Sequence, residues 1–233
     1  MELLHRVLPQ KPLSSLDAYF AAGGGVGLEN ARERRPADVI HLIDASGLRG
    51  RGGAGFPTGR KWRTVADNRS DLVATTVVVN AAEGEPGTFK DRTILAMTPY
   101  AVIEGALIAA HAVGASRVVF ATKPDRDAEV KQLQSAIAEM TAVGLHEGIE
   151  LDVFEGPHEY LYGEETALLE SLGGAPPFPR VAPPYRRGVG ALEEPEDEFD
   201  ASEPAATAVM SLRSSNTMNP HDPRPVPAAA MSS

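Results

Sequence analysis

A run of β-branched residues, Thr75-Thr76-Val77-Val78-Val79, is short, continuous and followed by a loop that contains glycine and proline. Such a run is typical of a strand buried on both faces of a sheet. Two further short segments, Arg117 to Ala121 and Ile149 to Phe154, also have the look of strands. We therefore expect three strands, each of which is too short to be confused with a long buried helix.

Apolar residues at helical spacing predict helices around these strands. We expect one helix from Pro36 to Ser46, one that contains Val102 to Val113, one opened by Pro124, and one from Glu164 to Leu172. Strands that alternate with helices are typical of an α/β domain, so we predict a Rossmann-like, mainly parallel sheet with flanking helices. Ligands of such sheets bind beyond the carboxyl ends of the strands.

The composition divides the chain into three segments. Residues 1–46 are expected to be a helical segment that packs on an α/β domain formed by residues 47–188. Residues 189–233 hold 2 basic and 8 acidic residues, whereas residues 1–188 hold 20 and 24. This last segment contains the run Glu193-Glu194-Pro195-Glu196-Asp197-Glu198 and has no helical or strand period. We therefore expect an acidic tail that is disordered.

The composition also excludes several classes of function. A chain of 233 residues with 42% hydrophobic content can bury a substantial core. Its net charge of −10 argues against nucleic acid as a partner. It has no cysteine, which excludes disulfides, a catalytic thiol and a cysteine-ligated iron–sulfur cluster within this chain. The spacing of the remaining candidate ligands predicts no metal site.

The N-terminal sequence carries no signal for export. The most apolar stretch, Ala101 to Val113, is too short to span a bilayer and includes Glu104 and His111. We therefore expect a cytoplasmic protein without direct membrane insertion, although a peripheral position on a membrane complex is compatible with this expectation.

Residues 47–63 combine glycine with positive charge. Six glycines lie between 47 and 59, and the segment has five cations and no anion. These cations are Arg49, Arg51, Arg60, Lys61 and Arg63. Glycine lets backbone N–H groups approach a phosphate closely, and a helix beginning near Lys61-Trp62 would add its positive end. The segment is thus a candidate site for a nucleotide or another phosphorylated cofactor.

Three other interpretations of this loop compete with phosphate binding. Glycine also occurs wherever a chain turns tightly, so the loop could be purely structural. An RGG-type nucleic-acid segment is disfavoured because the repeat is not sustained. Gly50 to Gly55 fits G-x-G-x-x-G, but no strand precedes it, and the chain has no G-x-x-x-x-G-K-[ST] motif.

Two loops bring carboxylates to the predicted ends of strands. The first strand is followed by Asn80, Glu83 and Glu85, and the third leads to Glu164 and Glu165 at a predicted helix start. Amide and carboxylate groups can bind sugar hydroxyls, which would complement a cationic phosphate loop in a dinucleotide or flavin site. Glu164 and Glu165 could instead be ordinary charges at a helix N-terminus.

Taken together, these segments resemble the flavin-binding subunit of NADH dehydrogenase, known as the F subunit of respiratory complex I. The resemblance rests on Gly47 to Gly59 followed by Lys61-Trp62, on Asn80 to Arg92, and on Tyr160 with Gly163 to Leu168. Pro176-Pro177-Phe178-Pro179 is also similar to the family. The match extends over nearly all of the predicted ordered part of this chain.

The resemblance implies an FMN and NADH site without a catalytic acid or base. It implies that Phe56 stacks on adenine and Lys61 contacts the flavin, while the other residues line the pocket or hold the ribityl and nicotinamide ends. Those residues are Gly50, Arg51, Gly52, Gly53, Asn80, Glu83, Glu85, Tyr160, Gly163, Glu164 and Glu165. NADH would pass a hydride to flavin N5, with the protein supplying orientation.

The sequence also departs from the family pattern. Ala82 occupies a position that is usually Asp, and Tyr162 one that is usually Cys. The family continues into a ubiquitin-like domain and a [4Fe–4S] domain, for which residues 189–233 show no counterpart. Two functions therefore remain open. One is an FMN-dependent NADH:acceptor (quinone-type) oxidoreductase that works with a thioredoxin-like [2Fe–2S] subunit or another iron–sulfur chain. The other is a truncated, non-catalytic relative that binds a nucleotide or a partner subunit.

Overall fold

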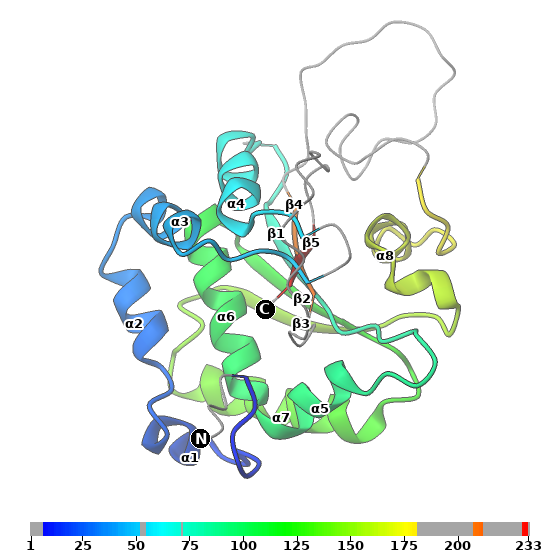
Figure 1. Ribbon diagram of the computed structural model, residues 1–233, viewed down its shortest axis with the longest axis horizontal. Coiled ribbons are helices and arrows are strands. Elements are labelled where there is room, and N and C mark those ends of the chain that lie inside the picture. The colour runs from blue at the N-terminus through cyan, green and yellow to red at the C-terminus, as the bar shows by residue number, and fades with distance from the viewer. Residues whose placement is uncertain (1–6, 52–54, 71, 181–206, 212–229, 233) are drawn as a thin grey trace, which may run out of the picture.

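The computed structural model describes residues 7–51, 55–70, 72–180, 207–211 and 230–232 of the chain. Its centre is a parallel sheet of five strands in the order β3-β2-β1-β4-β5 (Figure 1). The bounds are β1 Thr76–Asn80, β2 Arg117–Thr122, β3 Glu150–Glu155, β4 Thr207–Ser211 and β5 Ala230–Ser232. The prediction of an α/β fold with a Rossmann-like parallel sheet is confirmed.

Residues 189–233, which we expect to be a disordered acidic tail, include two short strands in the structure. Strand β4 lies parallel to β1, with Val78 opposite Val209, and β5 lies parallel to β4. The apolar run Ala208-Val209-Met210 is short enough to be outweighed by its acidic surroundings when composition is averaged over the whole segment. It supplies the backbone partners that the second edge of β1 requires. The acidic run itself lies outside the described residues.

The β-branched run of β1 is buried because both faces of the sheet are covered. Val77 and Val79 pack into a large core with helix α6 (Pro99–Val113), whereas Val78 packs into a smaller one with α8 (Glu165–Leu172). All three valines are at most 1% exposed. Residues that alternate along a strand face opposite sides, which explains why this stretch is apolar at every position.

Helices surround the sheet in the order that the sequence predicts, with some shifted boundaries. α7 (Asp127–Ala142) begins three residues after Pro124, and α4 (Thr58–Asp67) begins before Lys61. α5 (Lys90–Met97) was not predicted. The helical character expected for residues 1–46 is confirmed by α1 (Leu16–Ala21), α2 (Val26–Arg32) and α3 (Pro36–Ala45).

One buried carboxylate attaches the first two helices to the core. Glu104 on α6 accepts hydrogen bonds from the Tyr19 hydroxyl, from Gly25 N at 2.7 Å and from Leu28 N at 2.8 Å. It thereby caps the N-terminus of α2, where backbone N–H groups have no partner within the helix. Burial and the bond to Glu104 raise the pKa of Tyr19 well above its ordinary value.

Candidate functional site

The glycine-rich loop is closed at its base by backbone contacts. Gly50 N donates to Phe56 O at 2.8 Å and Thr58 N to Leu48 O at 2.9 Å, while Arg49 forms an antiparallel bridge with Pro57. The loop therefore leads directly into the first turn of α4. Arg51 is exposed on it, and Gly52 and Gly53 lie outside the described residues.

Gly59 lets α4 approach α3 closely. A Cβ atom built on Gly59 would lie 2.5 Å from both the N and the Cα of Asp44, which are backbone atoms that cannot move aside easily. Because Lys61 follows in the same helical turn, this contact also fixes where its side chain begins. Close packing between α3 and α4 thus requires glycine at position 59, whether or not the glycine-rich loop binds a ligand.

We expect Gly59→Ala to lower the free energy of unfolding by about 1–3 kcal/mol, because the added methyl group overlaps the α3 backbone. Urea denaturation of the two proteins measures the change. Gly173→Ala is the matched control, since its nearest atom would be Glu170 O at 3.3 Å, and we expect an effect below about 1 kcal/mol there. Equal midpoints for Gly59→Ala and wild type would contradict this account.

Lys61 is buried and faces a partly buried glutamate from a distant segment. Its side chain is 2% exposed, and its Nζ lies 3.8 Å from Glu165 Oε2 on α8. Burial lowers the pKa of Lys61 to about 8, against the opposing effect of Glu165. Burial likewise raises the pKa of Glu165 to about 7, although the ammonium acts in the other direction. The pair therefore connects the helix after the glycine loop to the start of α8.

Glu164 and Glu165 have different tasks, although they are neighbours. Glu164 is the N-cap of α8, and its carboxylate accepts hydrogen bonds from Thr166 N at 2.9 Å and Ala167 N at 3.0 Å. Glu164 thus caps the helix, as one of its two interpretations expected, and it also lines the cleft described below. Glu165 instead turns towards Lys61 and forms an ion pair with it.

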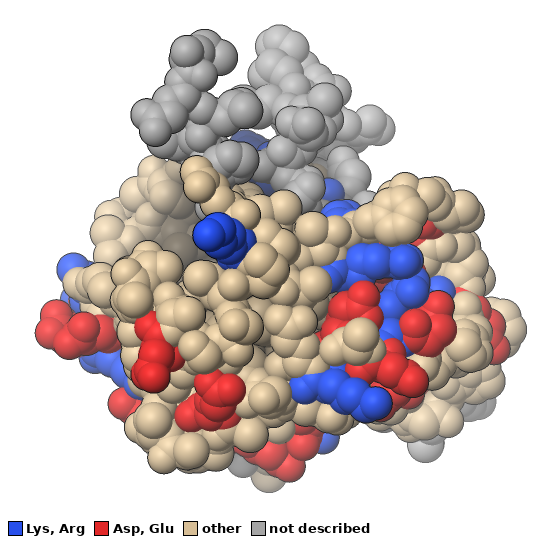
Figure 2. Space-filling view, turned by 90° about the horizontal axis from the view of Figure 1, so that it is seen from below, with Lys and Arg blue, Asp and Glu red and all other residues tan. Residues whose placement is uncertain are grey.

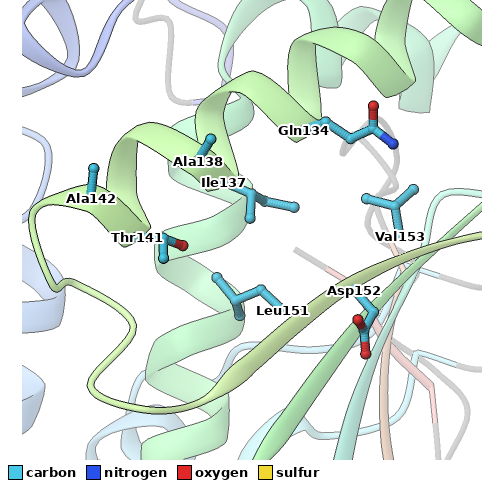
Figure 3. A pocket seen from close by; sticks show the side chains of 8 residues that line it. All are labelled: Gln134, Ile137, Ala138, Thr141, Ala142, Leu151, Asp152 and Val153. Atoms are coloured by element: carbon cyan, nitrogen blue, oxygen red, sulfur yellow. The ribbon is translucent and has the colours of Figure 1, made fainter.

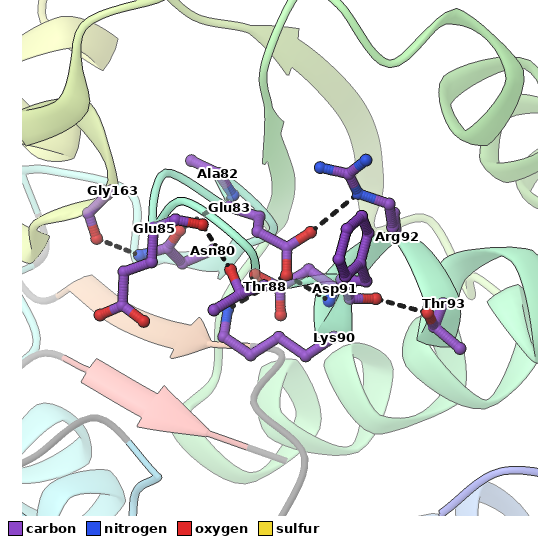
Figure 4. Close-up of polar contacts among 11 residues, drawn as sticks. Asn80, Ala82, Glu83, Glu85, Thr88, Lys90, Asp91, Arg92, Thr93 and Gly163 are labelled. Carbon is purple, nitrogen blue, oxygen red and sulfur yellow. Dashed lines mark hydrogen bonds and ion pairs between the residues drawn. The ribbon is translucent and has the colours of Figure 1, made fainter.

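The loop after β1 is bonded to the loop before α8. Asn80 Nδ2 donates to Gly163 O at 2.9 Å, and its Oδ1 accepts from Ala82 N at 3.1 Å (Figure 4). A Cβ atom on Gly163 would lie 2.7 Å from Ala82 O, so glycine is needed for this approach. Two segments that are far apart in sequence thus form a single wall.

Glu83 is buried in a network at the start of α5. Its Oε2 accepts from Arg92 Nε at 3.1 Å, its Oε1 accepts from Asp91 N at 3.3 Å, and Lys90 Nζ lies 3.9 Å from Oε1 (Figure 4). Burial opposes ionisation of Glu83, but the bond from Arg92 and the other contacts outweigh it and lower the pKa. The carboxylate is therefore engaged in holding its own loop.

Glu83→Gln should lower the free energy of unfolding by about 1–3 kcal/mol at pH 7, since charge-assisted bonds are lost. Because the folded-state pKa lies below the ordinary 4.5, the stabilisation by Glu83 is present above the unfolded-state pKa and disappears as pH falls through the folded-state pKa. The difference between variant and wild type should therefore shrink at acid pH. Urea titrations at several pH values measure it, with exposed Glu33→Gln as the control. A difference independent of pH would contradict this assignment.

These segments enclose a cleft of about 270 Å³ beyond the carboxyl end of β1. Of the residues predicted to bind a cofactor, the cleft is lined by Asn80, Glu85, Tyr160, Gly163 and Glu164. Sequence reasoning missed other lining residues, namely Gly84, Lys90, Asp91 and Leu161, and assigned Ala82 no contact. The Tyr160 side chain is 61% exposed, so its ring is available at the mouth of the cleft.

The glycine loop contributes an aromatic group near the buried lysine. The Phe56 ring lies 5.7 Å from Lys61 Nζ and 5.8 Å from the Arg60 guanidinium carbon. The Lys61–Glu165 contact joins this side to α8, whose N-cap lines the cleft. Four predicted site residues do not line the cleft, namely Phe56, Lys61, Glu83 and Glu165, and Gly50 and Arg51 lie in the loop rather than on the cleft wall.

A second lysine, which the sequence analysis did not identify, holds the loop that precedes α8. Lys123 follows β2 and donates hydrogen bonds from Nζ to the carbonyls of His158 at 3.1 Å and Glu159 at 3.2 Å. Burial lowers its pKa. The sequence did contain a signal for this residue. Lys123 follows a buried strand immediately, and ligands of parallel sheets bind beyond the carboxyl ends of the strands.

Charges of both signs are interleaved on one flank of the molecule. Figure 2 shows them side by side at the right, the side on which α5 and α8 lie in Figure 1, whereas much of the same face carries neither sign. At the start of α5, Lys90 and Arg92 are paired with the buried carboxylates of Glu83 and Asp91. The neighbourhood of the cleft is thus polar but largely compensated in charge.

A model of the Nuo51 FMN-binding domain family matches residues 43–198, a span that contains the glycine loop and both walls of the cleft. The chain belongs to the Nuo51 FMN-binding domain family. Its resemblance to the flavin-binding subunit of NADH dehydrogenase is thereby confirmed. The chain is 40% identical over 185 residues to the F subunit of NADH-quinone oxidoreductase from Aquifex aeolicus, and 45% identical over 160 residues to that from Rhodobacter capsulatus.

This member of the Nuo51 family spans less than half the length of these relatives. The matches cover 76% and 65% of the chain but only 43% and 37% of the Aquifex and Rhodobacter proteins. A solved structure of NAD⁺-reducing [NiFe]-hydrogenase in the air-oxidized state aligns with a TM-score of 0.67 and 32% identity. That alignment covers 85% of this chain and 32% of the hydrogenase chain.

In the described part of the chain, no single helix is long and apolar enough to cross a bilayer. Helices α5 and α6 meet that test of length and composition only as a pair, and this pair bends by 98°.

Proposed function

We propose that this chain binds FMN and NADH and forms the hydride-accepting module of an NADH dehydrogenase. One observation carries the proposal. The glycine loop, the loop after β1 and the start of α8 are far apart in sequence, yet they are joined by the Asn80–Gly163 bond and the Lys61–Glu165 pair. This puts a cationic, glycine-rich element beside a cleft with amide and carboxylate groups, as a flavin nucleotide requires.

The residues present fit a flavin nucleotide in chemical character. Thr58 at the first turn of α4 has a buried hydroxyl without a hydrogen-bond partner among the described residues, and Trp62 has a buried indole N–H of the same kind. Together with Lys61, these groups offer hydrogen bonds next to the glycine loop. The cleft volume is slightly below the usual ~300–1,000 Å³ of small-molecule sites, so a mononucleotide would occupy the cleft and extend out of it.

The proposed roles are those that the resemblance to the flavin-binding subunit implies. Lys61 would contact the flavin, Phe56 would stack on the adenine of NADH, and Gly50 to Gly53 with Arg51 would line the pocket. Asn80, Glu85 and the segment from Tyr160 to Glu165 would hold the ribityl and nicotinamide ends. Bound FMN would supply the hydride-accepting N5 atom and the ability to pass on single electrons. The protein would supply orientation.

A direct ribityl contact is not the best role for Glu83. Both of its oxygens accept hydrogen bonds from α5, and its side chain is 2% exposed. We propose that Glu83 positions the loop that carries Glu85. Electrons would leave for other redox subunits, such as an iron–sulfur protein, and the chain would work in the cytoplasm or peripherally on a membrane complex.

A nucleotide-binding function without electron transfer is the alternative. The observation that favours it is Ala82, which lines the cleft but offers no side-chain hydrogen bond. A weaker hold on the cofactor would follow, because a site loses about 0.5–1.5 kcal/mol for each hydrogen bond that it does not make.

An anaerobic titration separates the two functions. The purified chain is titrated with FMN and then with NADH while flavin absorbance is recorded. We expect FMN to bind at micromolar concentration and NADH to bleach it. Bound FMN that NADH cannot bleach would support the non-catalytic alternative, and failure to bind FMN would overturn both the proposed cofactor and its chemistry.

A further inference from the structure

Strand β3 lies at an edge of the described sheet. It pairs with β2 on one side, and none of the described strands pairs with its other side. Glu150 N donates to Ser116 O and Gly156 N to Thr122 O, both on the β2 side. Because successive residues of a strand alternate in direction, the N–H groups of Leu151 and Val153 point away from β2. They form a free row of backbone donors and acceptors.

A groove runs between this edge and α7. It has a volume of about 610 Å³, and Figure 3 shows the side chains of Leu151 and Val153 directed towards Ile137 of α7, with Asp152 directed away. These three apolar residues are only partly buried, and they pack against the main core. The groove thus offers apolar surface beside unused backbone hydrogen bonds.

The opposite face of the same edge is acidic. Glu150 and Asp152 share one cation, Arg117, whose Nε lies 3.7 Å and 2.6 Å from their carboxylates. Two carboxylates against one guanidinium leave this face with a net negative charge. An added strand would therefore meet apolar side chains on its one face and a net negative charge on its other face.

We propose that the β3 edge and its groove bind an extended segment of a partner protein in which apolar and basic residues alternate. The segment adds a strand to the sheet, its backbone pairs with Leu151 and Val153, and its apolar side chains enter the groove beside α7. Its basic side chains lie against Glu150 and Asp152. This surface is separate from the cleft, so the inference does not depend on the proposed cofactors.

Charge excludes two other occupants of the edge. A second copy of the chain paired antiparallel about Asp152 would bring Asp152 opposite Asp152, and like charges opposite each other destabilise a sheet. The acidic run Glu193 to Glu198 of this chain would meet the same repulsion. A basic segment has complementary charge, which favours its selection over other segments and raises its rate of association.

The test uses the full chain and a short fluorescent peptide of alternating valine and lysine. We expect saturable binding by fluorescence anisotropy. On binding, the amides of Leu151 and Val153 should become protected from hydrogen exchange, whereas the amide of Asp152, which points towards β2, should not change. A peptide N-methylated on the amides of one edge should lose binding, and one methylated on the other edge should retain it.

A charge exchange provides the matched control. Glu150→Lys combined with Asp152→Lys should weaken the valine–lysine peptide by at least about tenfold and create binding for a valine–glutamate peptide. The exposed pair Glu33→Lys and Asp67→Lys, with the same change in net charge, should do neither. Absence of binding, binding without protection of Leu151 and Val153, or an equal effect of both double variants would overturn the proposal.

Discussion

Lys61→Met will bind FMN about 10- to 100-fold more weakly than the wild-type chain, which corresponds to the ~1.5–3 kcal/mol of a hydrogen bond to a charged group. Methionine keeps an unbranched side chain in the buried space but removes the ammonium. The remaining carboxylate, Glu165, already has its pKa raised to about 7 by burial, and loss of Lys61 removes the charge that opposes this rise. The variant should therefore lose positive charge without gaining a buried anion.

Flavin fluorescence during an anaerobic titration measures the affinity. Lys131→Met, on the exposed surface of α7, is the same chemical change away from the cleft, and we expect its affinity for FMN to equal that of wild type within about twofold. Urea midpoints are measured in parallel so that lost affinity is not confused with lost folding. Unchanged affinity in Lys61→Met would show that the lysine and its loop are structural.

Glu104→Ala should cost about 3 kcal/mol or more of unfolding free energy. The substitution leaves the Tyr19 hydroxyl and the Leu28 N–H buried without their acceptor, and each unsatisfied buried donor costs about 1–3 kcal/mol. It also removes the cap of α2 and leaves a void where the carboxylate packs. Because α1 and α2 are attached through this residue, they should lose protection from hydrogen exchange before the sheet does.

Two further variants show how much of the lost stability comes from the hydrogen bonds of Glu104. Tyr19→Phe removes one of the three donors and should cost only about 1 kcal/mol, and Glu29→Ala on the exposed side of α2 should cost less than that. Urea denaturation and residue-resolved hydrogen exchange provide the measurements. If Glu104→Ala unfolds at the same urea concentration as Glu29→Ala, the carboxylate does not hold the N-terminal helices.

The strands around β1 could be predicted because their signal is local. Val77 to Val79 and Val118 to Phe120 are apolar at every position, as is typical of a short strand covered on both faces. Strand β4 could not be predicted in the same way. Its apolar run is short, and its stability comes from pairing with β1, which lies more than a hundred residues earlier in the sequence. Local composition carries no information about such a partner.

The residue types of the candidate site could be predicted from the sequence, but the individual role of each carboxylate could not. Glycine, cation and carboxylate patterns indicated which segments matter, and the structure brings Lys61, Asn80 and Glu165 into joined segments. Sequence alone could not show that Glu83 and Glu164 have their carboxylates occupied by local hydrogen bonds, while Glu165 does not cap α8. That distinction depends on helix boundaries, since a shift of one residue exchanges the cap with its neighbour.

The bond between Asn80 and Gly163 also has an entropic consequence. It joins the two walls of the cleft, and the near contact of Gly163 with Ala82 O leaves little freedom between them. A ligand that enters such a cleft does not have to order a loop. The loss of chain entropy on binding is therefore smaller, and more of the contact energy appears as binding free energy. Affinity should then depend on the groups that line the cleft, and association should not wait for a slow closing motion.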